Sequence, residues 1–224
     1  MIYLSKLTFD TTNHRVFQLL RSPYRVHAAI MRAFPPNHQP REETPDRSQR
    51  VLFRIEPPFP PSRPLATVLV QSLLPPDWKP LGLELGSSLS VEERFFAPEF
   101  RAGDQFWFRL RANPTIRRRA RGNCLKLGRR QGIYGREKLL TWLARKGVDG
   151  GASFSLSEPE PRIIDEGYWK AQKGQHHRQV ITIHTVLFEG KLTVTSPELF
   201  LETLKFGIGS AKGFGCGMVS LARV

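Results

Sequence analysis

The order of strand-forming and helix-forming segments restricts the fold of this chain most, because the same order occurs twice. Alternating apolar residues predict strands, and apolar residues at helical spacing predict helices. The first half of the chain gives a strand, a helix, two strands, a short helical turn and a strand, at residues 2–9, 23–34, 51–56, 66–73, 77–78 and 94–96. The stretch 35–50 between them has no periodicity and is predicted to be a loop.

The second half repeats this order. It gives a strand, a helix, two strands, a helix and a strand, at residues 105–112, 136–147, 179–188, 191–195, 197–206 and 217–221. Glu189 and Gly190 are predicted to form a tight hairpin turn between the two middle strands. This order is that of the ferredoxin-like unit. We therefore expect an α+β protein with two tandem ferredoxin-like (βαββαβ) domains, at residues 1–97 and 104–224.

Ser-Pro pairs begin a helix in both halves, at Ser22-Pro23 and at Ser196-Pro197. Ser is a good N-cap, and Pro suits the first helical position because its missing N–H has no partner there anyway. The shared signal is consistent with an old duplication.

A glycine-rich stretch precedes the last strand, with five glycines and Lys212 within residues 207–217. The phosphate-loop spacing G-x-x-x-x-G-K-[S/T] is absent, and too few residues follow for the helix and strand of a nucleotide fold. Gly207 is predicted to cap the preceding helix, while the other glycines allow tight turns and close packing. Direct contact with a ligand is the alternative.

Positive charge dominates the composition, with 34 Lys and Arg against 20 Asp and Glu, a net charge of +14. Most of these cations are Arg, which binds phosphate oxygens in pairs and stacks on bases. The excess favours nucleic acid as the partner, ahead of a membrane surface or an acidic protein. Cys124 and Cys216 lack the companions of a zinc site. Without a signal peptide or a long apolar stretch, we expect a cytoplasmic protein.

Two stretches concentrate this charge. Residues 109–130 contain nine Arg or Lys and no acidic residue, and residues 168–179 place Tyr168 and Trp169 beside cations, as single-stranded nucleic acid requires. The alternative is a solvated loop. The predicted RNA contacts in these stretches are Arg109, Arg111, Arg117, Arg118, Arg119, Lys170, Lys173 and Arg178. His176 and His177 are neighbours that would point to opposite faces of a strand, so they are poor co-ligands for a metal.

Tyr24 and His27 are the candidate catalytic residues. They lie one turn apart at the start of the first helix, where free backbone N–H groups favour a phosphate. An imidazole and a phenol beside a phosphate can cleave RNA by attack of the ribose 2′-OH. In the alternative, Tyr24 packs in the core and His27 is a satisfied surface histidine. No carboxylate pair or triad has metal-binding spacing, which argues against a two-metal nuclease.

The chain resembles the CasE family, the CRISPR-RNA-processing endoribonucleases of type I-E systems within the RAMP superfamily. Three segments carry the resemblance: Pro23-Tyr24-x-x-His27, FRLRANP at 108–114 and GIGSAKGFGCGMVSL at 207–221. The last fits the RAMP pattern of two glycine-apolar-glycine triplets five residues apart, with Gly207, Gly209, Gly215 and Gly217 in register. VLFEG at 186–190 agrees as well, whereas 35–50 and 150–178 have no clear counterpart.

The resemblance implies metal-independent cleavage of CRISPR precursor RNA at the repeat stem-loop, with a 2′,3′-cyclic phosphate and a 5′-OH as products and no cofactor. It also implies that the enzyme stays on the mature guide RNA as a subunit of a type I-E Cascade complex. Tyr24 and His27 match the family's catalytic pair, with their acid and base roles open, and Arg32 matches a basic position near the scissile phosphate. Lys212 is a candidate contact to the RNA backbone.

Two other functions remain open at this point. Related folds bind guide RNA without cutting it, so a non-catalytic RNA-binding subunit of a CRISPR ribonucleoprotein is the main alternative. An enzyme that processes tRNA or ribosomal RNA is the other.

Overall fold

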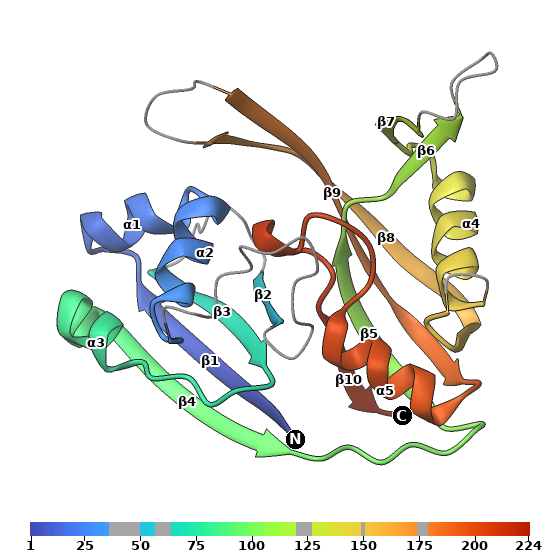
Figure 1. The fold of residues 1–224 in the computed structure, drawn as a ribbon, viewed down its shortest axis with the longest axis horizontal. Helices are drawn as coiled ribbons and strands as arrows, with labels where there is room; N and C mark the ends of the chain where they lie inside the picture. Colours follow the sequence, from blue (N-terminus) through green and yellow to red (C-terminus); the bar gives the residue numbers. More distant parts are fainter. Residues whose placement is uncertain (36–49, 57–63, 120–126, 149–150, 174–178) are drawn as a thin grey trace.

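The computed structural model describes residues 1–35, 50–56, 64–119, 127–148, 151–173 and 179–224 (Figure 1). Most of the loop predicted at 35–50 lies outside these residues, as do Cys124, His176 and His177. No helix within the described ranges is long and apolar enough to cross a membrane.

The first half of the chain forms a four-stranded antiparallel sheet in the order β2-β3-β1-β4. The strands are β1 (Ile2–Asp10), β2 (Val51–Ile55), β3 (Leu65–Ser72) and β4 (Leu89–Phe96). The helices of this unit are α1 (His14–Leu20), α2 (Pro23–Met31) and α3 (Lys79–Leu85), and the 3-10 turn η3 (Gly86–Ser88) follows α3.

The second half forms another four-stranded antiparallel sheet, in the order β10-β5-β9-β8. Its elements are β5 (Gln105–Ala112), α4 (Arg136–Gly147), β8 (Phe154–Lys173), β9 (Gln179–Val194), α5 (Pro197–Phe206), the 3-10 turn η4 (Lys212–Phe214) and β10 (Val219–Arg223). A separate hairpin of β6 (Thr115–Arg119) and β7 (Leu127–Gly132) lies between β5 and α4 in the chain.

Both sheets have the same strand order. In each, the unit's first strand lies between its fourth and its third, and its second strand forms the edge beside the third. This strand order in both units is that of the ferredoxin-like fold, so the predicted fold is confirmed.

The predicted hairpin turn at Glu189 and Gly190 is wrong. Strand β9 runs through both residues, and they pair with Arg109 and Phe108 of β5. Gly190 instead allows a close approach, because a Cβ there would lie 3.0 Å from Pro161. The true hairpin partner of β9 is β8, a strand that we did not predict.

Other element predictions need smaller corrections. Helix α1, capped by the Asn13 side chain, was not predicted, and the charged stretch after Arg111 contains the β6–β7 hairpin. The predicted helical turn at 77–78 is followed by the full helix α3. By contrast, β5 and α4 have the predicted bounds.

Two hydrophobic cores form among the described residues, one in each unit, and each includes one buried residue from the other unit. Ile2 of β1 packs in the second core, and Trp169 of β8 packs in the first. Figure 1 shows how this is possible, because the long β8–β9 hairpin extends from the second sheet toward α2. The exchange fixes the two units relative to each other, so residues of both can form one site.

Candidate RNA cleavage site

Helix α2 presents the two candidate catalytic residues. The Ser22 Oγ accepts a hydrogen bond from the Arg25 N–H, so Ser22 caps the helix as predicted. Val26 and Ile30 face the core, which turns Tyr24 outward with 40% of its surface exposed and leaves His27 half-buried. Tyr24 therefore does not pack in the core, contrary to one of the alternatives.

Packing holds the His27 ring in place. Its imidazole stacks on the buried Phe53 of β2, with ring centroids 6.0 Å apart and planes 12° from parallel. Its Nδ1 is buried and has no hydrogen-bond partner among the described residues. Burial lowers the pKa of His27 below its ordinary value of 6.5, which favours the neutral imidazole at neutral pH. His27 is thus not the satisfied surface histidine of the alternative interpretation.

The glycine-rich stretch brings the second unit onto this histidine. The turn η4 contacts α2 and β2. A Cβ at Gly213 would lie 3.5 Å from the His27 Nε2, 3.6 Å from Cδ2 and 3.9 Å from Cε1, so Gly213 covers the ring face near its Nε2 edge. A Cβ at Gly215 would lie 3.2 Å from the Phe53 ring. His27 is therefore enclosed by α2, β2 and the glycine loop.

Two glycines close the base of this loop. Gly207 and Gly217 have φ angles of +71° and +92°, and a Cβ at Gly207 would lie 2.6 Å from the Gly217 carbonyl oxygen. The Ile208 N–H donates to that oxygen, and the Gly217 N–H donates to the Arg111 carbonyl oxygen. Only glycine fits such a close crossing in the left-handed region.

Arg111 does not lie on an RNA-facing surface, so this prediction is corrected. Its side chain is fully buried, with Nε and Nη2 donating to the two carboxylate oxygens of Glu166, each at 2.6 Å. Nη1 donates to the Ile55 carbonyl oxygen in the first unit, and the guanidinium lies 5.3 Å from the centre of the Trp169 ring. Arg111 thus joins the two units.

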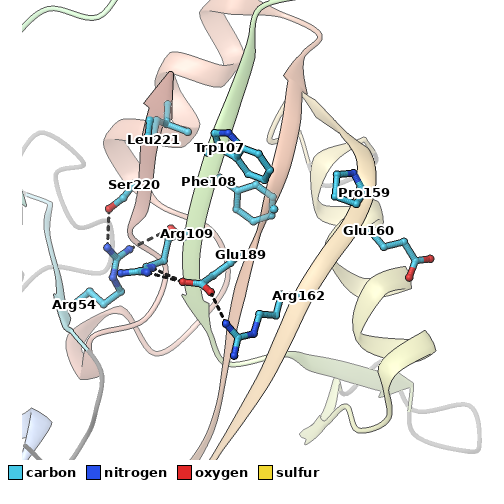
Figure 2. Close-up of a pocket in the computed structure, with 12 residues that line it drawn as sticks. Arg54, Trp107, Phe108, Arg109, Pro159, Glu160, Arg162, Glu189, Ser220 and Leu221 are labelled. Carbon is cyan, nitrogen blue, oxygen red and sulfur yellow. Dashed lines mark hydrogen bonds and ion pairs between the residues drawn. The ribbon is translucent and has the colours of Figure 1, made fainter. Parts of the chain in front are cut away.

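Arg109 lies on the same strand face as Arg111, as predicted, but two carboxylates engage it. Its guanidinium donates to Glu56 and to Glu189, each at 2.7 Å, and Figure 2 shows it beside the Glu189 carboxylate. Arg109 and Glu189 line a cavity of about 490 Å³. The buried Arg54 donates to the same Glu56 and to the Arg109 carbonyl oxygen. These ion pairs offset much of the positive charge that the sequence places there.

The other predicted RNA-binding residues occupy several places. Arg32 follows α2 and pairs with Glu84 of α3, with both side chains about half exposed. Lys212 begins η4, and Arg117 is exposed on β6. The structure does not describe the side chains of Arg118, Arg119, Lys170 and Lys173, and Arg178 lies outside the described residues.

Sequence reasoning missed a basic cavity of about 450 Å³ at the root of the β6–β7 hairpin. Its cations come from β6, β7 and α4, and none of its described lining residues is acidic: Arg117, Arg130, Arg145 and Lys146 line it together with Asn113, Ser210 and others. The cations on the outer face of α4 were the available signal. Among the residues in the described ranges, no group of three or more His, Cys, Asp or Glu could hold a metal ion.

A family model described as CRISPR associated protein matches residues 2–223. Because this match spans nearly the whole chain, the protein is a CRISPR-associated protein.

Individual relatives identify which group of CRISPR-associated proteins this chain belongs to. The CRISPR-associated endoribonuclease Cse3 of Thermus thermophilus is 29% identical, over 99% of this chain and all of that one. The Cascade subunit CasE of Escherichia coli is 28% identical, over 90% of this chain and 92% of that one. A solved structure of CRISPR endoribonuclease Cse3 bound to 19 nt RNA is 31% identical with a TM-score of 0.77, and covers both chains fully. The chain belongs to the CasE family of type I-E CRISPR endoribonucleases, which confirms the resemblance.

A second solved structure shows the same architecture. Thermus thermophilus Cse3 bound to an RNA representing a pre-cleavage complex is 30% identical to this chain, with a TM-score of 0.78 and 99% of each chain covered.

Proposed function

We propose that this protein cleaves CRISPR precursor RNA at the repeat stem-loop and stays bound to the mature guide RNA as a subunit of a cytoplasmic Cascade complex. The observation that carries the proposal is the His27 site, where a half-buried imidazole with a lowered pKa lies one helical turn from the exposed Tyr24 at a helix start. Its relatives, an endoribonuclease solved with an RNA representing a pre-cleavage complex and a Cascade subunit, support it.

The proposed reaction is an internal transesterification. The ribose 2′-OH attacks the adjacent phosphorus, the bond from phosphorus to the 5′-oxygen breaks, and the products carry a 2′,3′-cyclic phosphate and a 5′-OH. One group accepts the 2′-OH proton, and another donates a proton to the departing oxygen. The lowered pKa of His27 suits it to accept the proton.

Tyr24 and the start of α2 stabilise the developing charge in this scheme. The exposed phenol can donate a hydrogen bond to a phosphate oxygen, and the positive end of the helix dipole at the start of α2 favours the negative charge. No step in this scheme requires a metal ion.

The test is cleavage of the repeat RNA from the protein's own genome in excess EDTA. We expect full activity in EDTA, and a loss of about 10²-fold or more in His27→Ala with RNA affinity retained. Activity that disappears in EDTA and returns with Mg²⁺, while the RNA stays folded, would contradict the proposal.

A further inference from the structure

An aromatic cluster lies on the second unit, made of residues that the proposed reaction does not use. The His184 ring of β9 lies 4.8 Å from the ring of Tyr134, which follows β7, and 5.3 Å from the ring of Tyr168 on β8. The two tyrosine rings lie 6.5 Å apart. His184 is 4% exposed, whereas Tyr134 is 49% and Tyr168 58% exposed. Two half-exposed phenol rings thus rest on a buried imidazole.

The β8–β9 register explains which face the cluster occupies. Tyr168 pairs directly with His184, and the next pair, Trp169 with Ile183, is buried on the opposite face of the hairpin. Trp169 belongs to the core of the first unit, so the tyrosines point away from it. The sequence placed Tyr168 and Trp169 together as candidates for base stacking, and only Tyr168 is accessible.

The cluster is held rigidly. The Asp165 carboxylate lies 2.9 Å from the His184 Nε2, and it also accepts a hydrogen bond from the Gly167 N–H. The neighbouring Tyr134 hydroxyl raises the pKa of Tyr168. The His184 Nδ1 is buried and has no partner among the described residues. A pre-positioned aromatic surface loses little entropy when it binds a flat ligand.

A cavity of about 500 Å³ opens beside Tyr134. Its wall combines apolar surface from Ile116 and Trp142 with the cations Lys138 and Arg145. It shares Ile116, Trp142 and Arg145 with the basic cavity described above, and no acidic residue is among the described residues that line either. Aromatic surface therefore lies next to positive charge that the lining itself does not neutralise.

We infer that Tyr134 and Tyr168 stack an unpaired base of the bound RNA, while the cations of the adjoining cavities bind the phosphates that flank it. The inference rests on the proposed function, which brings RNA to this protein. It requires an unpaired nucleotide because bases in a stem are already stacked on one another. Aromatic rings beside cations are the usual surface for single-stranded nucleic acid.

The test compares two RNAs from the protein's own repeat, both with deoxyribose at the cleavage site. One keeps the nucleotides that flank the stem, and the other is trimmed to the stem-loop. Tyr134→Leu combined with Tyr168→Leu should weaken binding of the longer RNA by roughly 10- to 100-fold, the range for lost base stacking. Binding of the trimmed RNA should change less than about twofold. Tyr→Phe at both positions should keep the affinity, because the rings remain.

Phe95→Leu is the matched control, since Phe95 is 69% exposed on β4 of the other unit. It should leave both affinities unchanged. If the double Leu variant binds both RNAs like the parent, or loses affinity for both equally, the stacking site is wrong.

A second measurement uses the unmodified protein. A 2-aminopurine base placed in turn at each flanking position should be quenched on binding at one position at least, and the absence of any quenching would overturn the inference whatever the variants do. Cleavage by the parent protein is measured separately. Cleavage without base stacking would refute this site alone, whereas stacking without cleavage would refute the proposed reaction alone.

Discussion

Replacing Arg111 by Met would remove the cation from the contact between the two units. The change leaves the Glu166 carboxylate, whose side chain is only 13% exposed, without its two hydrogen bonds from the guanidinium. It also removes the donor to the Ile55 carbonyl oxygen and the packing on Trp169. Breaking a buried ion pair by removing one partner costs about 3–5 kcal/mol.

That loss should be large enough to measure by two routes. For a chain of this size, each kcal/mol lowers Tm by about 2–4 °C, so we expect a drop of about 6–20 °C. Urea unfolding should give the loss of free energy directly. Adding Glu166→Gln to Arg111→Met should recover part of it, because the unpaired charge is removed, and a double-mutant cycle isolates the coupling.

RNA binding distinguishes the structural role of Arg111 between the two units from the RNA contact that the sequence predicted. The salt dependence of RNA affinity should be the same in Arg111→Met as in the parent, measured where both are folded, because a buried guanidinium displaces no counterions. Arg117→Ala, at an exposed position on β6, is the comparison and should flatten the salt dependence without lowering Tm. An unfolding free energy within about 1 kcal/mol of the parent, set against the cost of a broken buried pair, would refute the reasoning. So would a salt dependence as flat as that of Arg117→Ala.

Three further predictions concern the site and its charge. Because burial lowers the pKa of His27, kcat/KM should stay level from neutral pH down past 6.5 and fall only as the pH passes the lowered pKa. Protonation of His27 should also lower the free energy of unfolding. A fall of kcat/KM centred above pH 6.5 would contradict this prediction. Phe53→Leu should reduce cleavage roughly 10-fold at unchanged RNA affinity, because Phe53 stacks on His27. Phe9→Leu, a buried control in the same core, should lose a similar free energy of unfolding and keep full activity. Equal activities of the two variants would count against a role for the Phe53–His27 stack. Replacing the three basic residues of β6 by Ala (Arg117, Arg118 and Arg119) should flatten the salt dependence of RNA binding. Replacing three exposed basic residues elsewhere (Lys79, Arg94 and Arg101) should flatten it less. Equal slopes would mean that the β6 cations are solvated and do not contact RNA.

Local patterns in the sequence predict the elements that have strong periodicity of their own. The helix 136–147 has apolar residues at helical spacing, and the strand 105–112 alternates, so both were found with the observed bounds. Glu189 and Gly190 look like turn residues, and only their pairing with β5 shows that they continue a strand. That pairing is a contact distant in sequence, which local propensity does not contain.

The residues of the candidate site likewise fall into those that local sequence indicates and those that only distant contacts bring together. The spacing of Tyr24 and His27 at a capped helix start is a local signal, and the structure places both residues there. Phe53 contacts His27 from strand β2, and Gly213 contacts it from the other unit, so no pattern in the sequence around His27 indicates either residue. Strand alternation puts Arg109 and Arg111 on one face, but it does not say that Glu56 and Glu166 lie opposite.

One measurement tests the proposed reaction most directly. It replaces a single ribose of the repeat RNA, the one upstream of the cut, by deoxyribose, and compares cleavage and binding with an RNA that carries deoxyribose at the neighbouring position. We expect cleavage to stop because no internal nucleophile remains, while affinity stays nearly intact because one hydroxyl is a small part of a charged interface. The neighbouring substitution should leave cleavage unchanged, with a cyclic phosphate and a 5′-OH on the products. Cleavage of the first RNA at the normal rate would contradict the account, however tightly the RNA binds.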